Sequence, residues 1–200
     1  YEIIINKTLM LLIKYSNYNL ECGVDEAGRG CLAGPVTAAA VILKPDFSHG
    51  LINDSKKLNA KLREKLVPII IENSICFAVK NISPKKIDEI NILNASILAM
   101  HKCIKALDPK PNFILVDGNK FKPFTNIPHK TIVKGDGKYL NIAAASILAK
   151  YYRDNYMKKI HVNFKNYGWF KNKGYPTKEH KINILKNGLT IHHRRTFKTS

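Results

Sequence analysis

Acidic residues are scarce in this chain, and long hydrophobic runs are missing. Of the 200 residues, 15 are Asp or Glu and 33 are Lys or Arg, so the formal net charge is +18. Such an excess indicates a polyanionic partner, either nucleic acid or an acidic membrane surface. No apolar run reaches the roughly 18 residues that a membrane span needs, and the run over 8–13 is too short for a signal sequence. We therefore expect no membrane partner and a cytoplasmic location.

Cysteine is also scarce. The four cysteines are Cys22, Cys31, Cys76 and Cys103. None belongs to a CxxC pair, which argues against a structural zinc site and against a disulfide framework. We interpret them as small buried side chains in a reducing compartment. The seven histidines lack metal-ligand spacing as well, and His192-His193-Arg194-Arg195 is interpreted as part of a basic tail.

Hydrophobic residues make up 45% of the chain, enough for one well-packed domain. Their spacing alternates between strand and helix and predicts an α/β fold with a mixed sheet, followed by a helical C-terminal part. Strands are predicted over 20–25, 36–43, 75–82, 113–117 and 131–134. Helices are predicted over 59–72, 83–107 and 141–160. The first two strands flank a glycine-rich turn and should form a hairpin.

Positive charge is concentrated at the C-terminal end. Residues 150–200 contain 13 Lys or Arg and two acids, with aromatic residues interleaved. This combination predicts a surface that faces nucleic acid. A solvated helix with inward-packed aromatic side chains is the alternative, which we expect to hold for some of these rings. Asp154 is four residues from both Lys150 and Lys158, so we interpret it as part of an ordinary surface ion pair.

Acids directly follow apolar, strand-like runs at three places: Asp25-Glu26, Asp117 and Asp136. Strand ends project side chains rigidly into one crevice, and converging carboxylates repel one another unless cations neutralise them. Hard oxygen ligands suit Mg²⁺ or Mn²⁺, and two such ions can promote phosphodiester cleavage. A lone Asp-Gly after a strand is more often a turn, so the adjacent acidic pair carries most of the weight.

Gly28-Arg29-Gly30 follows the acidic pair. Glycines permit unusual backbone angles and let a ligand approach backbone amides and carbonyls. Beside a metal site, such a turn suits contact with a sugar in a shallow minor groove, where the 2′-hydroxyl distinguishes RNA from DNA. An ordinary glycine-rich turn is the alternative, and motif length alone would favour it.

Together these residues resemble the motifs of the ribonuclease HII family. The similar segments, in chain order, are Asp25 to Gly30, Leu32 to Val36, Asp54 to Leu58, Val116 to Asn119, Lys134 to Asp136, Ile142 to Lys150, Arg153-Asp154 and Lys173 to Thr177. The resemblance implies a ribonuclease H-like fold, with a mixed sheet flanked by helices and a helical C-terminal extension. The chain would divide into an N-terminal extension and first strand region (1–19), a catalytic domain (20–160) and a basic helical region (161–200) that contributes to substrate binding.

The resemblance also implies a function. The family cleaves the RNA strand of RNA–DNA hybrids and incises 5′ of ribonucleotides embedded in duplex DNA, using two Mg²⁺ or Mn²⁺ ions and leaving 3′-hydroxyl and 5′-phosphate ends. The implied catalytic residues and metal ligands are Asp25, Glu26, Asp117 and Asp136. The implied substrate-binding residues are Gly28, Arg29 and Gly30 at the 2′-hydroxyl, Lys56 at phosphate, and Tyr175 stacked on the following deoxyribose.

Two alternatives remain open from the residues alone. A non-catalytic nucleic-acid-binding protein would explain the charge and the aromatic residues but not the strand-end acids. A resolvase or strand transferase on the same fold would use the acids but would not need a turn that contacts the 2′-hydroxyl. A monomer is expected by default. Residues 137–141 depart from the family pattern, and residues 1–9 stand before it begins.

Overall fold

The computed structural model describes residues 10–53, 55 and 58–198. Its centre is a five-stranded sheet in the order β3-β2-β1-β4-β5. The strands are β1 (Glu21–Ala27), β2 (Val36–Leu43), β3 (Ser74–Ile82), β4 (Phe113–Asp117) and β5 (His129–Ile132). β2 pairs antiparallel with β1 and β3, whereas β4 pairs parallel with β1 and β5. The carboxyl ends of β1 and β4 therefore lie at the same end of the sheet.

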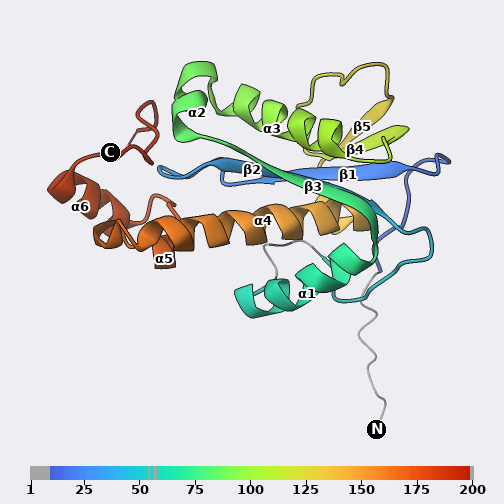
Figure 1. Cartoon of the computed structure of the whole chain (residues 1–200), viewed down its shortest axis with the longest axis horizontal. Helices are drawn as coiled ribbons and strands as arrows, with labels where there is room; N and C mark the ends of the chain where they lie inside the picture. The colour runs from blue at the N-terminus through green and yellow to red at the C-terminus, as the bar shows by residue number, and fades with distance from the viewer. Residues whose placement is uncertain (1–9, 54, 56–57, 199–200) are drawn as a thin grey trace, which may run out of the picture.

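Helices cover both faces of this sheet (Figure 1). One face carries α2 (Pro84–Ile90) and α3 (Ile92–Ala106), and the other carries α1 (Ala60–Glu72) and α4 (Leu140–His161). Alternate residues of β2 enter two separate cores: Ala38 and Ala40 pack with α3, whereas Ala39 and Val41 pack with α1 and α4. A strand buried between two helical layers requires apolar side chains on both of its faces.

Helix α4 packs closely against β1. A Cβ atom at Gly23 would lie 2.1 Å from the backbone carbonyl carbon of Asn141, so only glycine permits this approach. The alanines at 143–145, in the first turns of α4, are fully buried. This close packing brings Ser146 and Asp25 to the same cavity at the end of the sheet.

Most predicted elements are confirmed to within two residues, including the hairpin of β1 and β2 and the helix capped by Asn59. The single helix predicted over 83–107 is wrong. Asn91, with a left-handed φ of 65°, separates α2 from α3, and its side chain caps α3. The strand predicted over 131–134 lies at His129–Ile132, because Lys134 is also left-handed and the chain then turns.

The remaining elements are short and lie mostly at the C-terminal end: η1 (Gly135–Gly137), η2 (Lys165–Tyr167), α5 (Trp169–Asn172) and α6 (Lys178–Asn187). Trp169 is fully buried and packs with Met157 of α4 and with Leu32 and Ala33 of the loop between β1 and β2. Some of the C-terminal aromatic rings thus pack inward, as expected. This packing places the C-terminal segment against the turn that follows β1.

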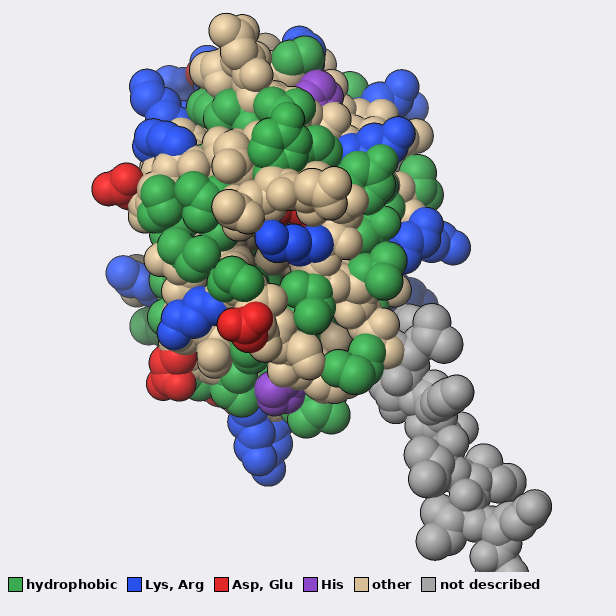
Figure 2. Space-filling view, turned by 90° about the vertical axis from the view of Figure 1, so that its right-hand side faces the viewer, with side chains coloured by type: hydrophobic (Ala, Val, Ile, Leu, Met, Phe, Trp, Pro, Cys, Tyr) green, Lys and Arg blue, Asp and Glu red, His purple; other side chains and the backbone are tan. Residues whose placement is uncertain are grey.

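On at least one side of the described surface, the positively charged side chains do not form a continuous band. On the face shown in Figure 2, Lys and Arg side chains drawn in colour stand apart, with hydrophobic side chains between them. No helix in the described ranges is long and apolar enough to cross a membrane. All four cysteines are free, and the interpretation as buried side chains is confirmed for Cys22, Cys31 and Cys103, whereas Cys76 is partly exposed.

Candidate active site

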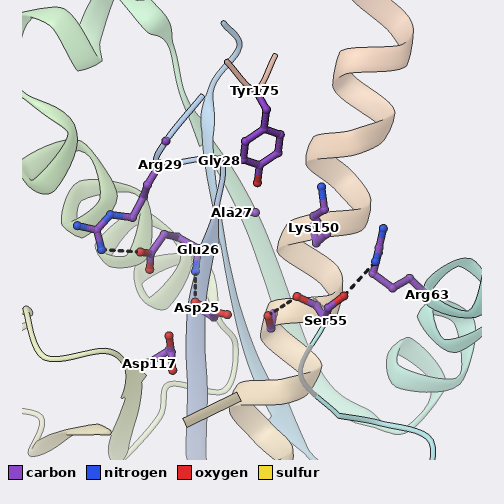
Figure 3. Close-up of a pocket in the computed structure, with 12 residues that line it drawn as sticks. Asp25, Glu26, Ala27, Gly28, Arg29, Ser55, Arg63, Asp117, Lys150 and Tyr175 are labelled. Carbon is purple, nitrogen blue, oxygen red and sulfur yellow. Dashed lines mark hydrogen bonds and ion pairs between the residues drawn. The ribbon is translucent and has the colours of Figure 1, made fainter. Parts of the chain in front are cut away.

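A cavity of about 470 Å³ opens where β1 and β4 end beside α4. Three acids line it: Asp25 and Glu26 on β1, and Asp117 at the end of β4. Figure 3 shows these side chains at neighbouring strand ends, with Asp25 and Asp117 facing the same space. The parallel pairing of β1 and β4 thus brings together three of the four acids predicted as ligands.

Asp25 is buried, at 5% exposed, and lies beside two other carboxylates. Burial raises the pKa of its carboxyl well above the usual value, and the nearby carboxylates of Glu26 and Asp117 raise it further. Hydrogen bonds from the Ser146 hydroxyl and from the Glu26 backbone N–H, the latter at 2.7 Å, act in the opposite direction. The ionised form of Asp25 is therefore unfavourable by itself, and a nearby cation would stabilise it.

The donor chemistry fits a divalent metal ion. Carboxylate oxygens are preferred ligands of Mg²⁺ and Mn²⁺. Glu26 forms an ion pair with Arg29 at 3.1 Å, and Asp117 Oδ1 accepts a hydrogen bond from Gly135 N at 2.7 Å. In this arrangement, no three acidic, His or Cys side chains of the described residues form a ready-made ligand cluster. The acids line one cavity, but their side chains do not converge on a single metal position.

The fourth predicted ligand is placed differently. Asp136 lies in η1, is 3% exposed and is not among the residues that line the cavity. It directly follows Gly135, whose N–H holds Asp117, so Asp136 is adjacent in sequence to a residue that contacts the acid cluster. Lys56, the predicted phosphate ligand, lies outside the described residues.

The Gly28-Arg29-Gly30 turn forms another wall of the cavity. Gly28 has a φ of +90°, and a Cβ atom there would lie 1.9 Å from Arg153 Nε, so both backbone angle and space require glycine. Nothing lies within 4 Å of a Cβ position at Gly30. The missing side chain at Gly30 therefore leaves open space beside the cavity.

The fully buried guanidinium of Arg194 holds this turn from behind. Its Nη2 donates to the carbonyl of Gly28 and its Nη1 to the carbonyl of Arg29, both at 2.7 Å, and its Nε donates to Gly34 O at 3.1 Å. Burial lowers the pKa of Arg194 to about 10, so the side chain stays positive at neutral pH. The carbonyls of the turn consequently point toward Arg194 and are fixed by it.

The interpretation of residues 192–195 as part of a basic tail is wrong for the middle of this segment. His193 is 3% exposed and Arg194 is 1% exposed. Arg153 on α4 is equally buried and donates to the carbonyls of Ala33 and Pro35 at 3.1 and 3.0 Å. These basic side chains are internal supports of the turn, which the sequence analysis missed because a run of basic residues looks like a solvated surface.

Two positively charged side chains lie near the acids. Lys150 on α4 and Arg63 on α1 line the cavity (Figure 3). Asp154 binds both, at 2.7 Å to Lys150 Nζ and 3.6 Å to Arg63 Nη2. The ion pair with Lys150 is confirmed, but the prediction that it is an ordinary surface pair is wrong, because Asp154 is 8% exposed. Its carboxylate positions two cations beside the cavity.

Tyr175 lines the cavity on the C-terminal side. Its ring centre lies 5.5 Å from Lys150 Nζ and 5.7 Å from the guanidinium carbon of Arg153, within the range of cation–π attraction. Burial raises the pKa of Tyr175, and Cys31 raises it further. The ring therefore presents a neutral phenol in a defined position near the Gly28–Gly30 turn.

Two serines connect the acids to the segment before α1. The buried hydroxyls of Ser55 and Ser146 lie 2.8 Å apart, and Ser146 also hydrogen-bonds Asp25. Arg63 Nη1 donates to the carbonyl of Ser55 at 3.0 Å. The small residues at the start of α4 indicated close packing there, but no sequence pattern predicted these contacts.

Comparisons with known sequences and structures agree on one family. The ribonuclease HII family matches residues 22–200. The chain is 60% identical to ribonuclease HII of Christiangramia forsetii over 176 residues, 88% of the chain and 89% of the relative. It is 55% identical to that of Bacteroides fragilis over 188 residues, 94% of each. The ribonuclease H2 structure from Pyrococcus horikoshii has a TM-score of 0.75 at 27% identity, covering 90% of the chain and 94% of that protein.

The matched range contains the four acids, the glycine turn and Tyr175. The mixed sheet with helices on both faces is the ribonuclease H-like fold that the resemblance implies. Enzymes of this family depend on a divalent metal ion, in agreement with the donor chemistry of the cavity. The chain therefore belongs to the ribonuclease HII family and is a hydrolase that cleaves phosphodiester bonds in the RNA of RNA–DNA hybrids.

Proposed function

We propose that this enzyme also incises duplex DNA on the 5′ side of a single embedded ribonucleotide, and that it leaves 3′-hydroxyl and 5′-phosphate ends. One observation carries the proposal: the acid cluster, the Gly28–Gly30 turn and Tyr175 line the same cavity. A strand that presents one ribose to the turn would thereby place the adjacent phosphate near the acids. A long hybrid is not needed for this arrangement.

In this proposal, Asp25, Glu26, Asp117 and Asp136 hold two divalent ions, Mg²⁺ or Mn²⁺. When bound, such ions supply an activated water and stabilise the leaving oxygen. The burial of Asp25 and its repulsion by neighbouring carboxylates support the first three ligands. Asp136 is supported by the family motif and by its place beside the Gly135–Asp117 hydrogen bond.

The turn is proposed to recognise the ribose through its backbone. A 2′-hydroxyl both donates and accepts hydrogen bonds, so backbone amides and carbonyls suffice to bind it. Arg194 fixes the carbonyls of Gly28 and Arg29, and Gly30 leaves space for the sugar. Tyr175 would stack on the deoxyribose that follows, which makes the RNA–DNA junction the recognised feature.

The phosphate contacts are proposed to come from cations around the cavity. Lys150 and Arg63 are positioned by Asp154, Arg29 belongs to the turn, and Lys56 is assigned on the family motif. Such contacts fix the register of a nucleic acid without reading its sequence, and they weaken as salt is added.

The test is cleavage of a labelled DNA duplex that contains one ribonucleotide, beside an all-DNA duplex and a long RNA–DNA hybrid, with Mg²⁺, Mn²⁺ or a chelator. We expect a metal-dependent nick directly 5′ of the ribonucleotide and an intact all-DNA control. Asp25→Asn should bind the same duplex without cutting it. Cleavage of the hybrid alone would refute the proposal, as would cutting of the all-DNA duplex.

A further inference from the structure

Two buried histidines behind Tyr175 form a hydrogen-bonded pair that the mechanism above does not use. His180, on α6, and His193, after α6, lie with their Nε2 atoms 3.3 Å apart. Trp169 Nε1 donates to His180 Nε2 at 3.0 Å. Thr190 N donates to His193 Nδ1 at 2.9 Å. Both rings are nearly inaccessible to solvent.

These donors determine the tautomers of both rings. His180 Nε2 accepts the indole proton, so its own proton sits on Nδ1 and is donated to the carbonyl of Tyr175 at 2.9 Å. His193 Nδ1 accepts the Thr190 proton, so its own proton sits on Nε2 and points at His180. The hydrogen bonds therefore run in one direction, from Thr190 through both imidazoles to Tyr175. Both rings are neutral in this chain, and the Thr190 hydroxyl lies 3.0 Å from His193 Nδ1 as a further partner.

A further proton on either ring would place two hydrogen-bond donors opposite each other. On His180, the new proton on Nε2 would face the N–H of Trp169 and the N–H of His193. On His193, the new proton on Nδ1 would displace the backbone N–H of Thr190, and the Thr190 hydroxyl at 3.0 Å would be its acceptor. Protonation of His180 thus breaks the hydrogen bonds that its Nε2 accepts, whereas the Thr190 hydroxyl leaves an acceptor for a proton on His193 Nδ1.

The pair joins two walls of the cavity. One end holds the backbone of Tyr175. At the other end, His193 is followed directly by Arg194, which fixes the carbonyls of Gly28 and Arg29. The same segment forms a β-bridge between His193 and Ala33. The packing of the two imidazoles therefore acts together with the backbone hydrogen bond from Leu32 N to Gly174 O, at 2.8 Å, in setting the distance between the ring of Tyr175 and the glycine turn.

We propose that His180 and His193 are positioning residues, which in their neutral form hold Tyr175 and the Gly28–Gly30 turn at the spacing that admits the substrate sugar. The inference rests on the proposed roles of Tyr175 and the turn. Neither histidine lines the active-site cavity, so each acts through the residue that it holds. Acidification should weaken substrate binding by breaking the contacts of His180 Nε2 with Trp169 and His193, which shifts His180 and the Tyr175 backbone that it holds relative to the turn.

The surroundings of the pair favour the neutral form. The rings of Trp169 and Tyr167 cover it from α5 and η2, with ring-centre distances to His193 of 5.3 and 4.9 Å. The facing titratable groups are the phenol of Tyr167, His192 on the C-terminal segment and Glu179 on α6. His193 also shares a cavity with charged side chains of α2 and the C-terminal segment, namely Lys85, Asp88, Glu89 and Arg195. Burial lowers the pKa of His180, although the Tyr175 carbonyl and Glu179 oppose this effect. Burial and the two neighbouring imidazoles lower the pKa of His193 to about 4.

Two isosteric variants of His180 separate positioning from simple packing. His180→Asn places an amide N–H near the former Nδ1 and can still donate to the Tyr175 carbonyl, but it cannot take up a proton. His180→Gln places its amide near the former Nε2 and can still meet Trp169, but it removes the side-chain donor to the Tyr175 carbonyl, which keeps only the hydrogen bond from Thr177 N at 2.8 Å. Loss of one such hydrogen bond corresponds to about a 10-fold change in binding. We expect KM for an RNA–DNA hybrid to stay within about 3-fold of wild type in His180→Asn and to rise about 10-fold in His180→Gln, with smaller changes in kcat.

The pH dependence gives an independent readout. Trp169 is the single tryptophan of the chain, and its indole bonds His180 directly. Its fluorescence therefore reports protonation of the pair without substrate or metal. In the wild type, the fluorescence change and the loss of hybrid binding, measured by anisotropy in a chelator, should share a midpoint below pH 6.5, the usual histidine pKa. His180→Asn should shift both curves together.

The outcomes separate this inference from the proposed function. Equal KM values for the two folded His180 variants, or a fluorescence midpoint unrelated to the binding midpoint, would overturn the positioning role. Failure of single-ribonucleotide incision would leave the test intact, because it uses the RNA–DNA hybrid. If Tyr175→Ala leaves hybrid KM unchanged, the assigned role of Tyr175 fails and the inference fails with it. If His180→Gln does not fold, the pH curves of His180→Asn still decide.

Discussion

Removal of the Arg194 side chain tests whether the glycine turn depends on support from the C-terminal segment. Arg194→Ala would leave the carbonyls of Gly28, Arg29 and Gly34 without their buried donors. A hydrogen bond to a charged group contributes about 1.5–3 kcal/mol, and three that share one side chain are not additive. We therefore expect the free energy of unfolding to fall by about 3–5 kcal/mol. For a protein of this size, about 2–4 °C per kcal/mol gives a decrease in Tm of about 6–20 °C.

The assay combines thermal unfolding with cleavage kinetics on an RNA–DNA hybrid below the new Tm. Arg195→Ala is the matched control, because Arg195 is the exposed neighbour and binds Asp88 through its backbone N–H, which the variant retains. The control should change stability by less than about 0.5 kcal/mol. In Arg194→Ala, KM should rise as well, since the turn loses its fixed carbonyls. Equal Tm values and equal KM values for the two variants would refute the reasoning.

Four further predictions concern the same site. Gly30→Ala should raise KM about 10-fold or more with little change in Tm, because its methyl group enters open space beside the cavity. Gly28→Ala should instead lower Tm, because its methyl group clashes with Arg153. Kinetics and thermal melting of both variants check this contrast. Asp25→Asn should abolish cleavage yet raise the Tm of the metal-free protein, because it removes a buried charge that Glu26 and Asp117 repel; a lower Tm would contradict the repulsion. His193 has its pKa lowered to about 4, so the unfolded chain takes up a proton first, and urea melts should show the free energy of unfolding decreasing by roughly 1–3 kcal/mol as pH falls from 6.5 to 4. If the four proposed side chains contact phosphate, hybrid affinity should fall about 150-fold between about 50 and 200 mM salt, and a flat salt curve would exclude those contacts.

The elements that follow from local pattern were predictable. The apolar runs that end in Asp25 and Asp117 form neighbouring parallel strands, so acids after strands meet at one end of the sheet. Asn59 caps α1 as its side-chain chemistry predicts. The helix predicted over 83–107 failed at Asn91, where a left-handed residue divides a continuous apolar pattern. The periodicity of apolar residues indicates which face of a helix packs on the core, but it does not reveal a single break in backbone direction.

By itself, the sequence determined the class of fold and the position of the glycine turn beside Asp25 and Glu26, because each depends on residues close together in the chain. The grouping of these acids with the distant Asp117 followed from the place of each at the end of an apolar strand. Only the tertiary structure decided what supports that site. Arg194 lies 165 residues from Arg29, whose carbonyl it binds, and Asp154 is a buried anchor of two cations rather than a surface partner. Charged and histidine side chains look alike in sequence whether they face water or the interior. Burial decides between these states, and it is set by the packing of the C-terminal segment against the turn after β1.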